Sequence, residues 1–165
     1  MPVGSAPRQI VGLVAWLLVT LLAAGLGAMA SIEAGPFYLQ LQRPSWAPPG
    51  SVFSPVWTTL FLLMAIAAWL VWRVRGFAGA RIALLLYLVQ LVFNVLWSWL
   101  FFGWHRGGWA FVDVMFLWGL ILATLIAFWH IRRLASLLLV PYLLWVGFAI
   151  ALNYSVWQLN PRLLG

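Results

Sequence analysis

Long apolar runs separated by short polar connections dominate the chain. Five runs reach about 20 residues, the length that an α-helix needs to cross the hydrocarbon core of a bilayer. They cover approximately residues 10–30, 55–72, 82–104, 109–129 and 134–157. The connections are short, apart from residues 31–54, and leave no room for a soluble domain. The pattern therefore predicts an all-α integral membrane protein, with residues 1–165 forming a single bundle of five transmembrane helices.

Composition indicates the same class. The chain has 165 residues, of which 66% are hydrophobic and 7% are charged, and its mean hydropathy is +1.06. A soluble domain of this length leaves roughly a third of its unfolded surface exposed and cannot bury so many apolar side chains. There is no cysteine, which excludes disulfides and thiolate ligands. His105 and His130 lie at run ends without a second ligand at a useful spacing, so we expect no metal site.

All nine cations are arginine, against only two acids, Glu33 and Asp113, which gives a formal net charge of +7. We expect no nucleic-acid partner, because the arginines are scattered at the ends of the runs, as is typical of anchors facing lipid headgroups. Six of them lie on the amino-terminal side of the bundle and three on the other. This asymmetry predicts that the amino terminus is inside and that residues 31–54 are outside.

The third run carries a polar stripe. Gln90, Asn94 and Ser98 recur at a spacing of four residues and therefore share one helix face. Amides in a bilayer either bond to a neighbouring helix or line a cavity that receives a polar ligand. The sequence leaves both interpretations open.

Tryptophans fall into two groups. Those at run ends are typical of anchors at the headgroup level: Trp72, Trp104, Trp109, Trp129 and Trp157. Those within runs carry an N–H donor that hydrocarbon cannot satisfy, so each is expected to face protein or a cavity: Trp16, Trp57, Trp97, Trp99, Trp118 and Trp145. In the last run, Trp145, Ala149 and Asn153 share one face, which offers a flat wall, a gap and a hydrogen-bonding group. Large flat ligands use such surfaces.

Asp113 is the only acid within a run and lies one helical turn after Trp109. A charge near the interface is tolerated if Arg106 or solvent reaches it, so we expect a structural role, with proton handling as the alternative. The chain lacks a nucleophile with a base and an orienting group, paired carboxylates and a phosphate-binding glycine loop. Hydrolase and phosphoryl-transfer chemistry are therefore not expected.

The connection before the second run is rich in proline. Residues 43–57 read RPSWAPPGSVFSPVW and contain four of the nine prolines. Prolines fix φ and lower the entropy cost of ordering a segment that has no helix or sheet ladder. We therefore predict that residues 31–54 form a lid over a pocket, with Trp46 as a plug. The alternative, a stiff linker between two helices, explains Pro55 but not Pro48 and Pro49.

The same stretch resembles the first-loop signature of the TspO/MBR family, which comprises bacterial tryptophan-rich sensory proteins and the mitochondrial translocator protein, or peripheral-type benzodiazepine receptor. The similarity continues in order along the chain, through QLVFN (90–94), FFG (101–103), GWAFVD (108–113), PYLLW (141–145) and LNYSVW (152–157). The matches extend from about residue 37 to residue 157 and touch every run but the first.

The resemblance implies a five-helix protein of a bacterial membrane, usually a homodimer, with a pocket beneath the first loop. Its implied ligands are tetrapyrroles such as protoporphyrin IX and heme, lipids or sterols such as cholesterol, and benzodiazepine-site drugs, with no obligatory cofactor. The positions matching the family's pocket are Trp57, Asn94, Trp109, Trp145 and Ala149. Trp57 and Trp145 match the tryptophan pair implicated in light-dependent porphyrin degradation and are the candidate catalytic residues.

To these ligand-binding candidates the helix faces and the lid add Trp46, Gln90 and Asn153. One departure from the family concerns sterols, because Gln158 occupies the basic position of the cholesterol motif of the mammalian protein. The function expected is a tetrapyrrole- and lipid-binding membrane protein with a sensory role. The alternatives are a transporter of porphyrins, lipids or sterols, and an interaction protein that passes its ligand-bound state to a partner.

Overall fold

The computed structural model describes residues 4–165. Within this range five helices are long and apolar enough to cross a membrane. They are α1 (Ala6–Ala30), α3 (Phe53–Gly79), α4 (Arg81–Ser98), α5 (Gly107–Trp129) and α6 (Arg133–Leu159). Each overlaps one of the five predicted runs, and the described residues contain no strand. The predicted fold class, an all-α bundle of five transmembrane helices, is confirmed.

Four short helices complete the fold: α2 (Ala34–Gln40), the 3-10 turn η1 (Gly50–Val52), the π-helical turn η2 (Trp99–Gly103) and α7 (Pro161–Leu164). Two of them lie in residues 31–54, which the sequence had led us to treat as one loop. Helix α2 was missed because it is only seven residues long and contains Gly35 and Pro36, both poor helix formers. The rest of the lid consists of a turn at residues 31–33 and an irregular segment at residues 41–49.

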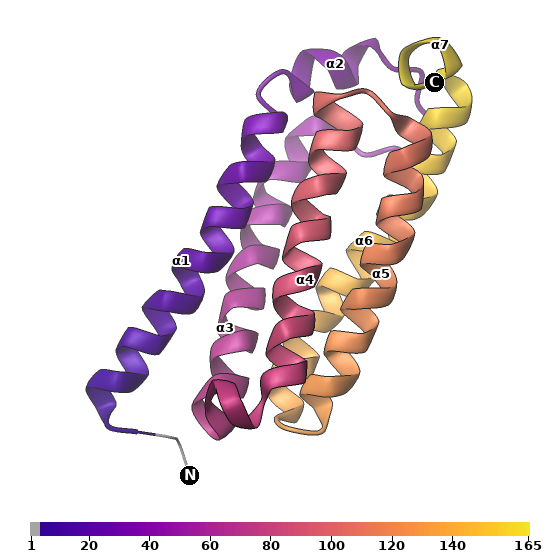
Figure 1. Ribbon diagram of the computed structural model, residues 1–165. Helices are drawn as coiled ribbons and strands as arrows, with labels where there is room; N and C mark the ends of the chain where they lie inside the picture. Colours follow the sequence, from indigo (N-terminus) through magenta and orange to yellow (C-terminus); the bar gives the residue numbers. More distant parts are fainter. Residues whose placement is uncertain (1–3) are drawn as a thin grey trace.

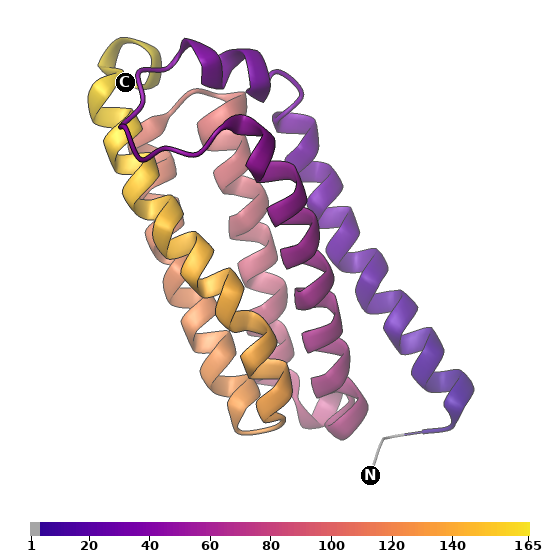
Figure 2. The same cartoon turned by 180° about the vertical axis from the view of Figure 1, so that it is seen from behind.

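The long helices form a closed ring of neighbours (Figures 1 and 2). Helix α1 packs against α3 and α4, α5 packs against α4 and α6, and α3 packs against α6. The lid and the carboxyl terminus lie at one end of the bundle, whereas the described chain begins at the other (Figure 1). The lid therefore lies at the opposite end of the bundle from the start of α1. We call the end with the lid the lid end. The opposite end, which carries six of the nine arginines, is the basic end.

Helix α1 shows how the sequence sorts lipid from protein. Its buried residues recur every third or fourth position and form one stripe: Gln9, Gly12, Trp16, Thr20, Ala23, Gly27 and Ala30. The remaining faces expose large apolar side chains, as lipid contact requires. Small residues in the stripe allow close approach. A Cβ built on Gly12 would lie 2.1 Å from the Trp72 ring of α3. Trp72, expected to be an interfacial anchor, is therefore a helix-packing residue.

Helix α4 ends in the π-helical turn. The amide of Trp104 donates to the carbonyl of Trp99 at 2.7 Å, five residues back, instead of four. This wider turn is followed by His105, whose φ of +52° reverses the chain towards α5. The His105 ring stacks on Phe37 of α2 with centroids 4.0 Å apart. The turn thus links the end of α4 to the lid, and π-helical turns of this kind often occur at functional sites.

Candidate functional site

The lid is held in shape by contacts within itself. The Tyr38 hydroxyl at the end of α2 donates a hydrogen bond of 2.8 Å to the carbonyl of Pro48. The Arg43 guanidinium lies over the Tyr38 ring, 4.7 Å from its centroid. One tyrosine therefore fixes both sides of the irregular segment, and the prolines limit what lies between.

A second set of contacts fastens the lid to the bundle. The Asn160 side chain, directly after α6, accepts a hydrogen bond from the backbone N–H of Gln42. It also donates one to the backbone carbonyl of Gln42, and each bond is 2.8 Å long. It also donates to the carbonyl of Val156 at 2.8 Å. The buried amide thus pairs with the backbone of Gln42 as a second peptide group would. Figure 2 shows the lid passing close to the carboxyl-terminal end of α6 before it returns to α3.

Beneath the irregular part of the lid, rings from α2, α3, α6 and the lid form one aromatic series. Neighbouring rings lie 5.4–5.8 Å apart, within the range of favourable edge-to-face and tilted contacts. In order, they are Trp46 of the lid, Phe148 and Trp145 of α6, Phe53 of α3 and Tyr38 of α2. Trp46 remains 47% exposed, so it covers the series from outside. The plug role expected for Trp46 stays a prediction.

A cavity of about 450 Å³ adjoins the lid. Its lining residues are Leu41, Arg43, Pro44, Ala47 and Pro49. Ala47 also packs against the same apolar cluster as Phe53 and Phe148, so the cavity lies next to the aromatic series. It is an open hollow, and all of its lining residues belong to the lid. The guanidinium of Arg43 places a positive charge in its wall.

Trp57 belongs to a neighbouring group that lies deeper in the bundle. Its ring meets Tyr142 of α6 edge-on, with centroids 6.2 Å apart. The Tyr142 hydroxyl donates to Gln90 Oε1 and accepts from Asn94 Nδ2, both at 2.7 Å. The two amides of the predicted polar stripe therefore bond to a neighbouring helix, which is the structural interpretation that the sequence had left open. Ser98 of that stripe lies at the approach of α4 to Gly27 of α1.

Asn153 is likewise engaged between helices. Its Oδ1 accepts from the Trp97 indole of α4, and its Nδ2 donates to the Gly107 carbonyl of α5, each at 3.0 Å. Asn153 thus joins α4, α5 and α6 near the lid end. In this conformation both ends of its amide are occupied by protein groups, so a ligand would have to compete for them.

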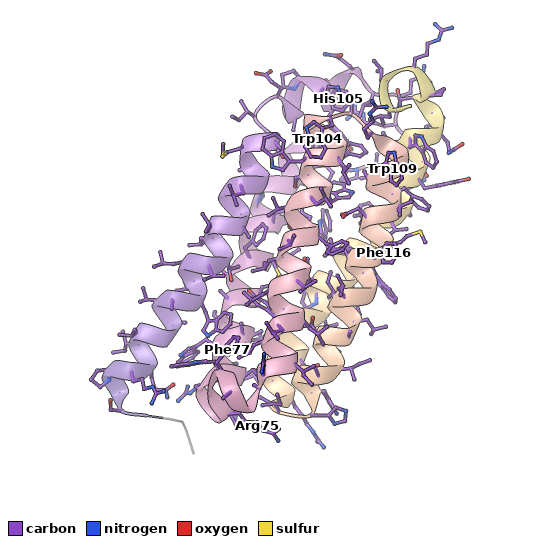
Figure 3. The ribbon with its side chains drawn as sticks, in the orientation of Figure 1. Arg75, Phe77, Trp104, His105, Trp109 and Phe116 are labelled. Carbon is purple, nitrogen blue, oxygen red and sulfur yellow. The ribbon has the colours of Figure 1, made fainter. Side chains whose placement is uncertain are left out.

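Trp109 is separate from these groups. It is 67% exposed near the start of α5 (Figure 3), and in residues 4–165 no ring contact joins it to Trp57 or Trp145. Ala149 lies one helical turn beyond Trp145 and is half-buried. Four predicted site residues, Trp46, Trp57, Trp145 and Ala149, therefore lie on the lid, α3 and α6, whereas Trp109 lies on the outer surface.

The tryptophans within the spans differ in their hydrogen bonds. The indole N–H groups of Trp97, Trp99 and Trp118 each donate to an acceptor on another helix, at 3.0–3.2 Å. This confirms, for these three, that an indole within a span faces protein. By contrast, the part of the chain that the structure describes offers no acceptor to the indole N–H of Trp57 or Trp145. Both candidate catalytic residues retain a donor that a ligand can use.

Asp113 is 5% exposed, and neither of its carboxylate oxygens has a hydrogen-bond partner among the described residues. The structural role was expected if Arg106 or solvent reached the carboxylate, but Asp113 forms no ion pair within residues 4–165 and both of its oxygens are buried. Asp113 therefore lies deeper between the helices than its place one turn after Trp109 had indicated. Asp113 lies on the buried side of α5, which also carries Ala110, Val114 and Leu117.

Sequence reasoning missed several residues that build the site: Tyr38, Phe53, Tyr142, Phe148 and Asn160. A signal existed for Tyr142, because two buried amides at Gln90 and Asn94 require a polar partner on another helix. No comparable signal marked Asn160, whose partner is 118 residues away in the sequence.

These features define a class of protein. It is a multi-pass α-helical membrane protein with a candidate site, lined by aromatic rings, beneath a proline-rich lid. The model of the TspO/MBR family matches residues 14–158, so the chain belongs to this family. It is 44% identical to the human translocator protein over 126 residues, 75% of each chain. It is 38% identical to the tryptophan-rich sensory protein of Cereibacter sphaeroides over 149 residues, 88% of this chain and 92% of that protein. Protein CrtK of Rhodobacter capsulatus is 41% identical over 140 residues.

Proposed function

We propose that this protein binds a flat tetrapyrrole, such as protoporphyrin IX or heme, between the lid and helices α3 and α6, and that the bound state serves a sensory role. The names of its relatives, a sensory protein and a translocator protein, support a membrane sensory or transport role. The observation that carries the proposal is the aromatic series beneath the lid, together with the unpaired indole donors of Trp57 and Trp145.

The chemistry of the site suits such a ligand. Tetrapyrroles are flat and apolar across the ring and acidic at their propionates, so they need aromatic walls, space and a positive group at the mouth. Trp145 and Phe148 supply walls, and the small side chain of Ala149 leaves space one turn away. Arg43 in the cavity wall supplies a charge for a propionate. Lipids, sterols and benzodiazepine-site drugs would use the same apolar surfaces without the charge.

Light-dependent degradation of the bound porphyrin is the second part of the proposal. The oxidant would be dioxygen, and the light would be absorbed by the porphyrin itself. Trp57 of α3 and Trp145 of α6 are the candidate oxidisable side chains, and the described residues offer no acceptor to their N–H groups. No hydrolytic or phosphoryl-transfer chemistry is required.

Transport through the centre of the bundle is less well supported. A polar path would need free hydrogen-bonding groups, but Gln90 and Asn94 are both bonded to Tyr142. A ligand that enters beneath the lid from the lipid would leave this network intact. We propose that the protein works as a homodimer in a bacterial membrane, as the family resemblance implies.

Three variants test the site. Protoporphyrin is titrated against intrinsic tryptophan fluorescence, and its Soret absorbance is then followed under illumination. We expect Ala149→Leu to weaken binding about tenfold, because overpacking a filled site costs about 1 to 3 kcal/mol. Trp145→Phe should retain most of the binding, since a ring remains, but abolish light-driven loss of the Soret band.

Trp109→Phe is the comparison variant, because Trp109 is also a predicted ligand-binding residue but is exposed and separate from the aromatic series. A site confined to the lid, α3 and α6 predicts little effect of this change. We expect it to leave both affinity and photochemical loss within about twofold of the unmodified protein, as is usual for a surface substitution. Unchanged affinity in Ala149→Leu, or equal effects of Trp109→Phe and Trp145→Phe, would place the ligand outside this site. Circular dichroism of each variant verifies that the helices remain intact.

A further inference from the structure

The end of the bundle opposite the lid carries most of the charge. Its six arginines are Arg8, Arg73, Arg75, Arg81, Arg132 and Arg133. The chain has only two acids, and neither lies there: Glu33 precedes α2 at the lid end, and Asp113 is buried in α5. No protein carboxylate can therefore neutralise the basic end. Its counter-charges must come from other molecules.

Two of these arginines lie over tryptophan rings. The Arg73 guanidinium lies over the Trp69 ring, 4.5 Å from its centroid, and the Trp69 N–H is itself anchored to the carbonyl of Gln9 at 3.0 Å. Arg133 lies over Trp129 at 5.2 Å. A guanidinium that stacks through its face keeps the N–H donors around its edge free. Such an edge matches two oxygens of a phosphate group.

The surroundings place these donors at the level of lipid headgroups. Trp129 is exposed, and amphipathic indoles prefer the boundary between hydrocarbon and water. Phe77, which follows the kink in the last turn of α3, is an exposed apolar ring at the same end of the bundle as Arg75 (Figure 3). Gly76, with φ of +66°, ends the regular part of α3 and permits this kink. Apolar rings and cations thus alternate at the basic end, as they do at surfaces that meet both the acyl chains and the headgroups of a membrane.

We propose that the basic end is a binding surface for anionic phospholipids, with the stacked pairs Arg73–Trp69 and Arg133–Trp129 as its headgroup sites. Each guanidinium edge binds phosphodiester oxygens. The net negative charge of the lipid offsets the positive charge of the arginines. A zwitterionic lipid offers the same phosphate but no net charge, so it binds more weakly. The surface is independent of the tetrapyrrole site, which lies at the other end of the bundle.

The test compares two lipids and two matched variants. The purified full-length chain in a non-ionic detergent is titrated with phosphatidylglycerol, and separately with phosphatidylcholine of the same acyl chains, and bound lipid is counted by native mass spectrometry. We expect the unmodified protein to prefer phosphatidylglycerol. Arg73→Gln with Arg133→Gln should weaken binding of that lipid about 25-fold, since each cation near a membrane surface contributes about a factor of five. Arg106→Gln with Arg162→Gln, which removes two cations from the lid end, should change it less than about twofold.

A second pair of substitutions at the basic end shows whether any loss of lipid binding is caused by misfolding. Arg75 and Arg132 are exposed, and within residues 4–165 neither lies over an aromatic ring, so replacing both by Gln leaves helix packing unchanged. We expect phosphatidylglycerol binding to fall by about fivefold, less than for Arg73 and Arg133, because these two arginines add positive charge but are not the proposed headgroup sites. Loss of binding in both basic-end pairs, with the lid-end pair unaffected, supports the proposal. Equal binding of the two lipids by the unmodified protein, or equal losses in the basic-end and lid-end pairs, overturns it.

Discussion

Tyr142→Phe isolates the polar centre of the bundle. The substitution keeps the ring that meets Trp57 and removes only the hydroxyl. Two buried groups lose their partner: Gln90 Oε1 and Asn94 Nδ2, each 2.7 Å from the hydroxyl oxygen. Gln90 and Asn94 are 1% and 5% exposed, so water cannot readily replace the missing group. The change therefore measures what these bonds contribute to the stability of the bundle.

The magnitude follows from the two bonds. Hydrogen bonds between transmembrane helices contribute on average about 0.6 kcal/mol and at most about 1.7 kcal/mol each. Two such bonds give a loss of about 1 to 3 kcal/mol, consistent with the cost of leaving buried polar groups unpaired. Equilibrium unfolding in mixed micelles, followed by circular dichroism, measures this loss. Tyr154→Phe is the matched control, because Tyr154 lies on the same helix, is 50% exposed and makes no hydrogen bond through its hydroxyl in the described structure.

Equal stabilities of Tyr142→Phe and Tyr154→Phe would refute the reasoning, because the hydroxyl would then contribute nothing. A double-mutant cycle with Asn94→Ala identifies the partner, with an expected coupling of about 0.6 to 1.7 kcal/mol. Porphyrin affinity provides a second readout. If it collapses in Tyr142→Phe while stability is unchanged, the amides belong to the ligand site and not to the interface between helices.

Two further substitutions test the packing of α1 and the fastening of the lid. Gly12→Ala should destabilise the protein by about 1 to 3 kcal/mol in the same unfolding assay, because the new Cβ overlaps the Trp72 ring. Gly25→Ala, on the same helix, is the control and should be neutral or stabilising, because its new Cβ meets no atom within 4 Å. Asn160→Ala should speed hydrogen exchange at the backbone amide of Gln42 about tenfold, since the lid loses both hydrogen bonds to Asn160. Unchanged exchange would show that other contacts hold the lid.

The sequence predicted the features that depend on local composition. Hydropathy located the five spans, because each must match the thickness of the bilayer by itself. The clustered prolines located the lid. The spacing of Gln90 and Asn94 predicted one shared polar face but left its purpose open, since the partner, Tyr142, is 52 residues from Gln90 and 48 from Asn94 in the sequence. Only the packing of α4 against its neighbours in the ring decides which group the amides meet.

Residues that face in unexpected directions show the same limit. Trp109 and Trp145 are both tryptophans matched to the family's pocket, yet Trp109 is exposed on α5 whereas Trp145 lies in the aromatic series. The rotation of each helix about its axis separates them, and that rotation depends on packing, such as the close approach of Gly107 to Trp157. The ligand-binding role of Trp109 stays a prediction, and a ligand that reaches it would have to lie at the outer surface of α5.

The distribution of hydrogen bonds divides the polar groups of the bundle into two kinds. Gln90, Asn94 and Asn153 are each bonded to another helix, so they fix how α4, α5 and α6 pack. The indoles of Trp57 and Trp145, nearer the lid, have N–H groups that the described residues leave unpaired. Substitutions of the first kind should therefore alter stability before affinity, and those of the second kind affinity or photochemistry before stability. Because the two kinds meet at the contact between Trp57 and Tyr142, that contact is where ligand occupancy would be transmitted to helix packing, as a sensory role requires.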